Sequence, residues 1–455
     1  MFKKLFAIFI ILGLLSFTSD KKLYQNSAFQ HSVTAYFIKN ITNNQIIDKH
    51  NEELFLTPAS TQKIITTSLA LDILGKDYEF YSFLALNGNI QNQILQGDLI
   101  IAPNFNPGFC NKRWGYELNH LQNIIEEYCE KKDIKSINGK ILIVDGLQNN
   151  EINNRKWIWE DMGNYYGAST QCVILNENKL ELYFTSEEVG EITKITSIQP
   201  NYNVGINNFV KAYKGNNDKA YAFSKNNDSF IEVRGEIPAN QTNFKVIASL
   251  PNPLQVLKKY IKDNVNIKHK GIDVINSTHN INTKSEFKFH KVSALKVIQE
   301  TNSKSNNILA ETLWAHILKL EKNTENLYKK AGGIFNQVPP KLFDGCGLSP
   351  MNNLSCLHLN HILEKQKNNP DFKESLSVLG KSGTLSSWLK NTPAEGNIWA
   401  KSGSMEGVRA YTGYIKTKKS HLLTFTFIVN NYVSSNESSI KSQIQTYLLE
   451  LFLNN

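Results

Sequence analysis

The most informative part of the sequence is the place where a short polar stretch leads into a long apolar one, Thr57-Pro58-Ala59-Ser60-Thr61-Gln62-Lys63-Ile64-Ile65. Thr57 is a suitable helix N-cap, Pro58 a suitable first helical residue, and Gly75 a natural stop. Between these ends, apolar residues fall on most sides of the predicted helix. We therefore expect the helix to lie buried at the centre of a domain.

Ser60 and Lys63 stand three positions apart near the start of this helix, a spacing that places both side chains on one face. A buried lysine loses hydration, its pKa falls, and its amine can accept a proton from a serine hydroxyl. The pattern alone is weak, because Ser-x-x-Lys occurs six times, beginning at Ser19, Ser60, Ser285, Ser293, Ser387 and Ser438. Only the tetrad at Ser60 heads a buried apolar helix, which makes it the candidate nucleophile and base.

Ser305-Asn306-Asn307 comes just before a predicted helix that continues Ile308-Leu309-Ala310. The motif offers a hydroxyl that could shuttle a proton and an amide that could hold a substrate. A plain helix cap is the alternative, since serine and asparagine serve well there.

Lys401-Ser402-Gly403-Ser404 precedes a β-type run. An ammonium and hydroxyls on an edge strand would bind a carboxylate, and the glycine would let a substrate backbone approach. A surface turn is the alternative. Lys381-Ser382-Gly383-Thr384 has the same form, but we prefer Lys401 because a pair of strands follows it.

The wider pattern predicts one sheet built from both ends of the chain. Strand-like runs at His31–Lys39 and Gln45–Asp48 form a hairpin, and β-rich runs at Gly407–Lys416 and Leu422–Asn430 precede a last helix. Such a sheet with helices on either face is an α/β sandwich. Residues 86–284 have a different texture, with short β-type runs between turns, and we interpret them as a large α+β insertion.

The composition bounds the partners and the location. The 455 residues carry a formal net charge of +9, scattered along the chain, and we expect no dedicated nucleic-acid site. Lys3 and Lys4 precede an apolar run from Leu5 to Leu15, the pattern of a secretory signal peptide. The run is short for a membrane span, although an uncleaved anchor is the alternative. We therefore expect the mature chain to work outside the cytoplasm.

The cysteines are Cys110, Cys129, Cys172, Cys346 and Cys356, and an odd number leaves one unpaired if the others form disulfides. Their spacing forms no metal pattern. Cys356, His358 and His361 would not converge on one face of a helix, so we predict no metal site.

Ser-x-x-Lys, Ser-x-Asn and Lys-Ser-Gly in this order form the signature of penicillin-binding proteins and serine β-lactamases. Further runs agree with one branch of that group: Trp159-Glu160-Asp161-Met162, Asp344-Gly345-Cys346-Gly347-Leu348-Ser349 and Gly383-Thr384-Leu385. The chain resembles the low-molecular-mass class C penicillin-binding proteins, the D-alanyl-D-alanine carboxypeptidase/endopeptidase family, over nearly all of its mature length. It departs from the family at Cys346, where serine is usual, at Ser402, where threonine is commoner, and after Gly97, where a glycine cluster is missing.

The resemblance implies a β-lactamase/DD-peptidase-like α/β sandwich with a large α+β insertion. Residues 1–19 would be the signal peptide, residues 20–85 and 285–455 the peptidase domain, and residues 86–284 an inserted region of two subdomains. The mature protein would be periplasmic.

The resemblance also implies roles for the motif residues. Ser60 would be acylated with Lys63 as its base, and Ser305 and Asn307 would shuttle the proton and hold the substrate. Lys401, Ser402 and Ser404 would bind the terminal carboxylate, with Gly403 beside them, and the backbone N–H groups of Ser60 and Ser404 would form the oxyanion hole. Asp161 would bind the amino group of the substrate side chain; a surface acid beside Trp159 is the alternative.

The implied activity is that of a serine-type D-Ala-D-Ala carboxypeptidase or endopeptidase. It would act on peptidoglycan stem peptides through an acyl-enzyme, need no metal or cofactor, and be inhibited covalently by β-lactams. Two alternatives stay open: a β-lactamase-type hydrolase, against which the long insertion argues, and a catalytically inactive cell-wall-binding scaffold, against which the intact motifs argue. The resemblance specifies no oligomeric state.

Overall fold

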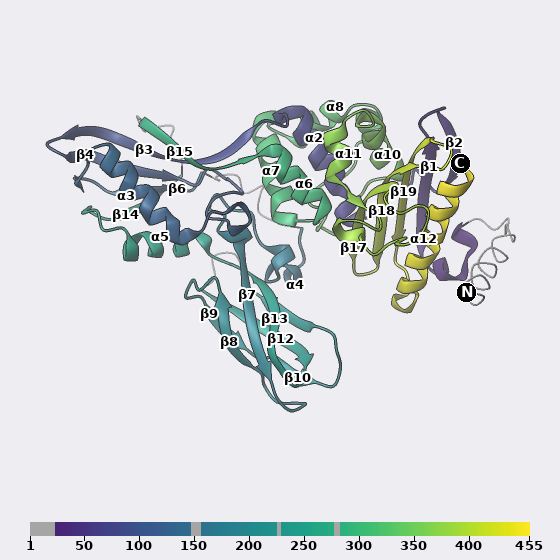
Figure 1. Ribbon diagram of the computed structural model, residues 1–455, viewed down its shortest axis with the longest axis horizontal. Helices are drawn as coiled ribbons and strands as arrows, with labels where there is room; N and C mark the ends of the chain where they lie inside the picture. The colour runs from purple at the N-terminus through teal and green to yellow at the C-terminus, as the bar shows by residue number, and fades with distance from the viewer. Residues whose placement is uncertain (1–22, 147–155, 225–228, 277–282) are drawn as a thin grey trace, which may run out of the picture.

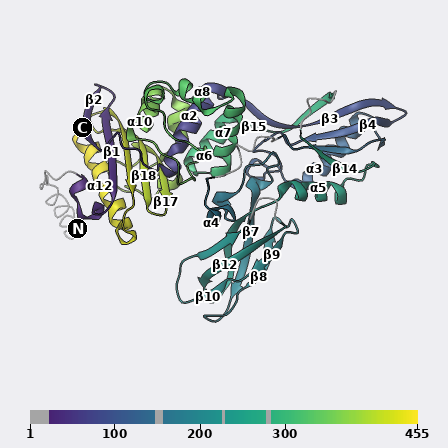
Figure 2. The same cartoon turned by 180° about the vertical axis from the view of Figure 1, so that it is seen from behind.

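The computed structural model describes residues 23–146, 156–224, 229–276 and 283–455. The predicted signal peptide at residues 1–19 lies outside the described residues. Figures 1 and 2 show an elongated molecule in which a mixed helix–sheet lobe holds both ends of the chain, and two β-rich regions extend away from it.

A six-stranded antiparallel sheet forms the centre of the lobe that holds the chain ends. Its strands follow the order β16 (Ser377–Val378), β17 (Ile398–Met405), β18 (Val408–Lys416), β19 (Leu422–Asn430), β1 (Val33–Asn40) and β2 (Gln45–His50). β1 pairs with β19 along its whole length, so the two ends of the chain share one sheet, as the sequence predicted.

Alternate residues of this sheet enter two separate cores, because successive strand side chains point to opposite faces. Ala35 and Phe37 pack in the cluster that holds most of the helices, whereas Tyr36 and Ile38 pack on the C-terminal helix. The first face is covered by α2 (Lys63–Leu74), α6 (Ala294–Ser303), α7 (Asn307–Glu321), α8 (Thr324–Ala331), α9 (Ile334–Gln337), α10 (Cys356–Lys365) and α11 (Pro370–Ser375). The second face is covered by α12 (Glu437–Asn454), which lies across the sheet from those helices (Figure 1). The predicted α/β sandwich is therefore confirmed.

The start of the central helix differs from the prediction. Ser60 lies in a 3₁₀ turn over Ala59–Gln62, and α2 begins at Lys63. The Thr57 hydroxyl donates to the Pro350 carbonyl at 3.2 Å, so the prediction that it caps the helix was wrong. The turn is pressed against β17, where a Cβ on Gly403 would lie only 2.7 Å from the Pro58 carbonyl oxygen. At the other end Gly75, with φ of 80°, closes the helix as predicted.

The predicted insertion contains three sheets. The first comprises β14 (Ile272–Ile275), β6 (Ile141–Val144), β4 (Ile94–Ala102), β3 (Glu79–Gln91) and β15 (Lys284–Ser293), with β5 (Ser136–Ile137) on β4; α3 (Leu121–Lys131) and α5 (Pro253–Asn264) belong to the same region. The second comprises β13 (Gln241–Ser249), β7 (Lys179–Ser186) and β8 (Lys194–Gln199). The third comprises β10 (Lys211–Tyr213), β12 (Phe230–Pro238) and β11 (Lys219–Phe223), with β9 (Gly205–Asn208) on β12. One hydrophobic cluster runs through all three, and the division into two subdomains stays a prediction.

Two long strands connect this region to the sandwich. β3 and β15 pair antiparallel, and each carries residues of both cores. Phe80 and Val292 belong to the core of the sandwich, whereas Leu84 and Phe289 belong to the core of the inserted region. The predicted domain limits at 85 and 285 thus fall inside these strands.

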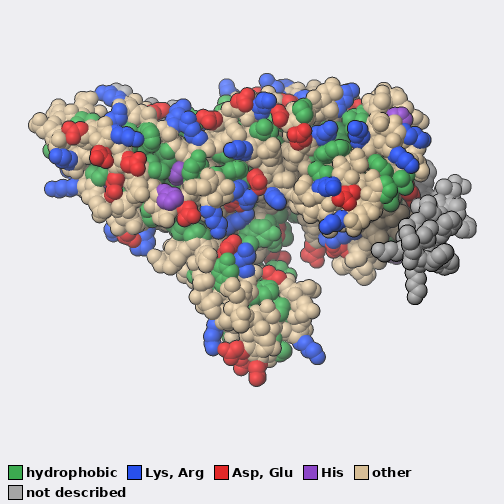
Figure 3. Space-filling view, in the orientation of Figure 1, with side chains coloured by type: hydrophobic (Ala, Val, Ile, Leu, Met, Phe, Trp, Pro, Cys, Tyr) green, Lys and Arg blue, Asp and Glu red, His purple; other side chains and the backbone are tan. Residues whose placement is uncertain are grey.

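All five cysteines are buried with free thiols. Within the described ranges no helix is both long and apolar enough to cross a membrane. Figure 3 shows Lys and Arg side chains spread over the visible face among Asp and Glu, without a single basic patch.

Candidate active site

The three motifs meet in a cleft of about 1080 Å³. Its lining includes Ser60, Ser305, Asn307, Ser402, Ser404 and Asp161. The cleft lies where the edge of the large sheet faces α4 (Trp159–Met162) of the inserted region, and the space-filling view shows the molecule hollowed between these parts (Figure 3). The structure thus brings together residues from four distant parts of the sequence.

Lys63 is fully buried beneath the floor of the cleft, and among the described residues its amine donates to neutral acceptors. Its Nζ lies 2.8 Å from Ser60 Oγ, 2.7 Å from Asn307 Oδ1 and 2.6 Å from the Cys346 carbonyl oxygen. Burial lowers the pKa of Lys63, although the nearby acids Asp344 and Glu311 partly oppose the shift. This geometry suits a neutral amine that takes the proton of the Ser60 hydroxyl.

Lys401 forms a second buried amine with its own serine. Its Nζ donates to Ser305 Oγ at 2.8 Å and to the Ser402 carbonyl at 2.8 Å. Burial, and next the charge of Lys63, hold the pKa of Lys401 well below its usual range. Ser305 itself has a φ of 58°, a left-handed conformation that is uncommon for serine and often marks functional turns.

The strand that carries Lys401 has an open edge toward the cleft. β16 covers β17 only at Trp399 and Ala400, so residues 401–405 have no strand partner on that side within the described part of the chain. Gly403 allows this segment to approach the Ser60 turn, since a Cβ there would lie 3.1 Å from the Ser60 nitrogen. An extended peptide could therefore add to the sheet beside Ser60.

The competing triplet at Lys381 lies outside the cleft lining. The Lys381 side chain is exposed and forms an ion pair with Glu395 at 2.9 Å. Its last residue nevertheless belongs to the site: Thr384 lines the cleft, and its hydroxyl lies 2.8 Å from the Ser402 hydroxyl. Thr384 belongs to the Gly383-Thr384-Leu385 run of the family resemblance, and its place in the cleft could not be predicted from that run.

Asp161 projects from α4 into the same cleft, among Tyr165, Tyr166, Tyr221 and Phe223. Burial among these rings raises the pKa of Asp161 to about 6, although a hydrogen bond with Tyr166 opposes the shift. The Tyr166 carbonyl in turn accepts from Asn307 Nδ2 at 2.7 Å. The segment that carries the acid is therefore tied to the second motif.

A buried carboxylate that the sequence analysis missed anchors this region. Glu177 accepts from Asn306 Nδ2 at 2.8 Å, from Lys179 Nζ at 2.6 Å, and from Arg113 Nε. The two cations overcome burial and lower the pKa of Glu177 from 4.5 to about 2. Arg113 also contacts Glu300 at 2.6 Å. These contacts join the inserted region to the Ser305 turn, and no local pattern in the sequence announces them.

The Asp344-Gly345-Cys346 turn supports Lys63 from behind. Asp344 accepts from the Gly347 and Ser349 backbone at 2.7 and 2.6 Å, and Glu311 accepts from the Cys346 nitrogen at 2.6 Å. Burial raises the pKa of Glu311 to about 8. Ligand atoms of Glu311, Asp344 and Cys346 lie within 4.8 Å of one another, but the turn engages both carboxylates, so we assign this cluster to holding the Cys346 carbonyl toward Lys63.

Ser404 is held by an arginine on the neighbouring strand. Arg409 Nη1 donates to Ser404 Oγ at 2.5 Å and to the Met405 carbonyl at 3.0 Å. Arg409 Nη2 forms an ion pair with Glu437 Oε1 of α12 at 2.5 Å. The helix on the far face of the sheet thus contributes to the position of a hydroxyl in the cleft.

A sandwich with paired Ser–Lys contacts at the edge of its sheet defines a class of serine acyl-transfer enzymes. The D-Ala-D-Ala carboxypeptidase 3 (S13) family matches residues 18–451, and the chain belongs to this family. The family resemblance and the enzyme class predicted from the sequence are therefore confirmed.

The chain is similar to characterised relatives along most of its length. It is 24% identical over 428 residues to D-alanyl-D-alanine carboxypeptidase DacB of Haemophilus influenzae, which covers 88% of this chain and 86% of that protein. It is 26% identical over 436 residues to penicillin-sensitive carboxypeptidase A of Dictyostelium discoideum, covering 86% and 81%. The crystal structure of penicillin binding protein 4 from Haemophilus influenzae matches with a TM-score of 0.79 at 22% identity, over 95% of this chain and 98% of that one. This last likeness concerns the fold.

The contrast between the two Lys-Ser-Gly triplets gives a direct prediction. Lys401→Ala removes the buried amine that contacts Ser305 and should slow acylation by a β-lactam by about a hundredfold or more. Lys381→Ala removes only an exposed ion pair and should leave the rate near wild type. Stopped-flow acylation by a chromogenic β-lactam measures both, and the reverse order of effects would show that the wrong triplet had been chosen.

The Glu177 contacts predict a pH-dependent stability. A carboxyl whose folded pKa is depressed stabilises the fold above its unfolded pKa, and loses that contribution as pH falls from about 4.5 toward 2. Glu177→Gln should therefore lower stability by about 2–4 kcal/mol at pH 7, because Arg113 and Lys179 lose their carboxylate, and by much less at pH 3. Thermal unfolding at both pH values checks this. The control Glu300→Gln, which removes a more exposed partner of Arg113, should cost below about 1 kcal/mol; equal losses in the two variants would contradict the assignment.

Proposed function

We propose that this protein is a serine-type D-Ala-D-Ala carboxypeptidase/endopeptidase that acts on peptidoglycan stem peptides through an acyl-enzyme. The observation that carries the proposal is the 2.8 Å contact between Ser60 Oγ and the buried Lys63 amine, beside an open strand edge. Membership of a carboxypeptidase family supports the reaction class. The substrate and the roles below belong to the proposal.

Acylation begins with attack of Ser60 Oγ on the carbonyl carbon of the penultimate D-alanine. The hydroxyl proton passes to Lys63 Nζ, whose neutral form burial favours because it lowers the pKa of the amine. Negative charge develops on the former carbonyl oxygen, where the backbone N–H groups of Ser60 and Ser404 would stabilise it. The peptide bond then breaks, and the departing amine needs a proton.

In the proposal the Ser305 hydroxyl gives its proton to the departing amine and regains one from Lys63, which returns the Lys63 amine to its neutral form. The Ser305 hydroxyl contacts Lys401 Nζ, while the Asn307 amide spans the space between Lys63 and the Tyr166 carbonyl. D-Alanine, or the amine of a crosslinked strand, leaves. Water then attacks the carbonyl carbon of the Ser60 ester, and Lys63 takes a proton from that water. The proton returns to Ser60 Oγ as the ester bond breaks, which releases the shortened peptide.

The terminal carboxylate of the substrate would lie beside β17. Lys401, Ser402 and Ser404 supply an amine and two hydroxyls on one short segment, and Thr384 adds a third hydroxyl next to Ser402. Gly403 lets this strand edge lie directly against the Ser60 turn, because a Cβ there would come within 3.1 Å of the Ser60 nitrogen. These groups select a chain terminus over an internal peptide segment.

Relatives support the inhibitor part of the proposal. One relative is named a penicillin-sensitive carboxypeptidase, and the Haemophilus influenzae penicillin binding protein 4 has been solved in complex with a β-lactam. We propose that β-lactams acylate Ser60 of this chain as substrate mimics. We also propose export by residues 1–19 and a periplasmic location, since the stem peptides lie outside the cytoplasm.

Replacing the nucleophile tests the proposal. Ser60→Ala should abolish peptidase turnover and covalent penicillin labelling, with a loss of at least about a thousandfold in rate. Mass spectrometry of the intact protein after incubation with penicillin, and of products from purified muropeptides, measures both effects. Ser387→Ala, in a tetrad outside the cleft lining, is the matched control and should label normally. Persistent labelling of folded Ser60→Ala would contradict the assignment.

Asp161 should determine which stem peptides are cleaved. Its carboxylate would bind a free amine on the residue before D-Ala-D-Ala, so Asp161→Ala should slow cleavage of such peptides by about tenfold to a hundredfold. N-acetylated analogues should be cleaved equally by mutant and wild type. Because the pKa of Asp161 is about 6, the wild-type preference for the free amine should fall as pH drops below 6. Kinetics at pH 5 and 7.5 decide this; equal slowing of both peptides would show a role other than recognition.

A further inference from the structure

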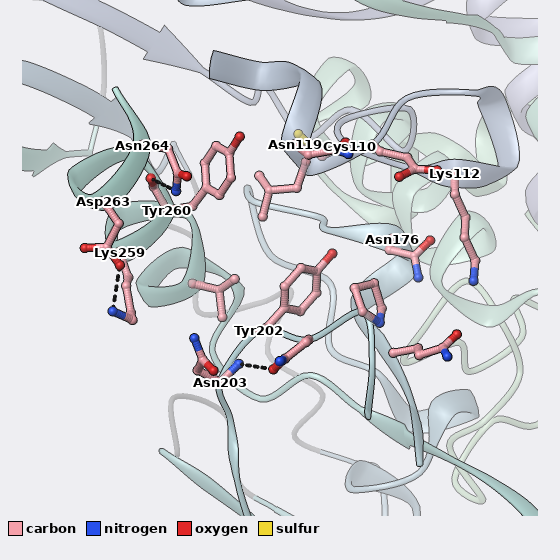
Figure 4. A pocket seen from close by; sticks show the side chains of 16 residues that line it. Cys110, Lys112, Asn119, Asn176, Tyr202, Asn203, Lys259, Tyr260, Asp263 and Asn264 are labelled. Atoms are coloured by element: carbon pink, nitrogen blue, oxygen red, sulfur yellow. Dashed lines mark hydrogen bonds and ion pairs between the residues drawn. The ribbon is translucent and has the colours of Figure 1, made fainter. Parts of the chain in front are cut away.

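A second pocket of about 550 Å³ lies in the inserted region, apart from the catalytic cleft. Its walls come from α5, from the segment 110–119, from Asn176, and from the segment 199–203 that follows β8. Figure 4 shows Tyr260 on one side of the space, Lys112 and Asn176 on the other, and Tyr202 between them. Its volume falls in the range of pockets that hold small ligands.

The lining has two aromatic rings and an unusual number of amides. Tyr202 and Tyr260 are half-buried, and the Tyr260 hydroxyl already has a backbone partner at Gln122. The amides are Asn119, Asn176, Gln199, Asn201, Asn203 and Asn264. A ring face covers the apolar side of a ligand, and a carboxamide both donates and accepts hydrogen bonds. This combination suits a ligand with a flat apolar face and a rim of hydroxyl and amide groups.

The charges around the pocket do not favour an ionic ligand. Lys259 pairs with Asp263 at 2.7 Å, and Lys112 and Glu117 are the other charged residues of the lining. Opposite charges in equal number leave the lining without a net charge that would select an anion or a cation. A neutral polar ligand fits better.

The pocket shares a wall with the catalytic cleft. Lys112 lines the pocket, while the next residue, Arg113, lines the cleft. Asn176 lines the pocket, while the next residue, Glu177, accepts from Asn306 beside the Ser305 turn. Consecutive Cα atoms are about 3.8 Å apart, so the two spaces lie back to back. A polymer could therefore occupy both at once.

We propose that this pocket binds an N-acetylated sugar of the glycan chain whose peptide branch enters the catalytic cleft. The identity of the sugar rests on the proposed function; the neutral, ring-stacking, amide-rich chemistry rests on the pocket itself. Tyr202 and Tyr260 stack on the sugar ring, and the amides bind its hydroxyl and acetamido groups. The pocket thus makes the enzyme faster on glycan-linked peptides than on free ones.

Direct binding tests the pocket without reference to catalysis. Calorimetry of the mature protein with a tetramer of N-acetylglucosamine should show binding, and a tetramer of glucose, which lacks the acetamido group, should bind at least about tenfold more weakly. Tyr202→Ala should weaken binding of the N-acetylglucosamine tetramer by about tenfold or more. The double variant Asn119→Ala/Asn203→Ala should do the same, and because both side chains are exposed, their removal should change the stability of the fold little. Tyr213→Ala, a partly exposed tyrosine on β10 that lines neither pocket, should bind as wild type.

Kinetics then tests the link to the cleft. The ratio of kcat/KM for a disaccharide-linked pentapeptide to that for the free pentapeptide should exceed about ten in the wild type, and should approach one in both pocket variants. The proposal is overturned if the wild type does not bind the tetramer. It is also overturned if neither Tyr202→Ala nor the double variant changes the binding and the ratio of kcat/KM values. If neither peptide is cleaved while the tetramer binds as expected, the proposed function fails and the sugar pocket stands.

Discussion

The site depends on the burial of two lysine amines within one small region. Lys63 and Lys401 are both fully buried, and an amine removed from water favours its neutral form unless an acid compensates it. The structure supplies mainly neutral acceptors: serine hydroxyls, an asparagine oxygen and two backbone carbonyls. The charge of each amine also disfavours the charge of the other. This arrangement keeps at least one amine ready to accept a proton, and most other features of the cleft hold the neutral acceptors in place.

Those supports lie largely outside the three motifs. The Cys346 carbonyl points at Lys63 because Asp344 and Glu311 fix the turn that carries it. Asn306 is held by Glu177, which two cations of the inserted region keep ionised. Ser404 is held by Arg409, and Arg409 by Glu437 on the opposite face of the sheet. The inserted region and the C-terminal helix are thus parts of the active site, although neither carries the nucleophile.

The sequence predicted the elements that depend on local pattern. The shared sheet and the buried helix followed from periodicity along the chain, whereas the choice of Lys401 over Lys381, made from the strands that follow Lys401, stays a prediction. Thr57 does not cap the helix because the contact with β17 shapes the Ser60 turn. The residues in contact, Pro58 and Gly403, are some 340 positions apart in the sequence, so no local pattern predicts it. Glu177 and Arg113 could not be paired from the sequence, since each looks like an ordinary surface charge until the fold buries them together. Thr384 could not be predicted because it belongs to the triplet that begins at Lys381. The lysine of that triplet is outside the cleft lining, whereas its threonine lines the cleft beside Ser402.

The paired strands β3 and β15 have a mechanical consequence. A domain joined by loops can rotate about a few residues, whereas a domain joined by two hydrogen-bonded strands must bend a sheet in order to move. Here Phe80 and Val292 face each other in register at the sandwich end of the pair, so bending would also disturb its core. The walls of the cleft are therefore set at a fixed distance before any substrate arrives. Little of the binding free energy is then consumed in closing the enzyme around its ligand, and the shape of the ligand, rather than the compliance of the protein, decides what is admitted.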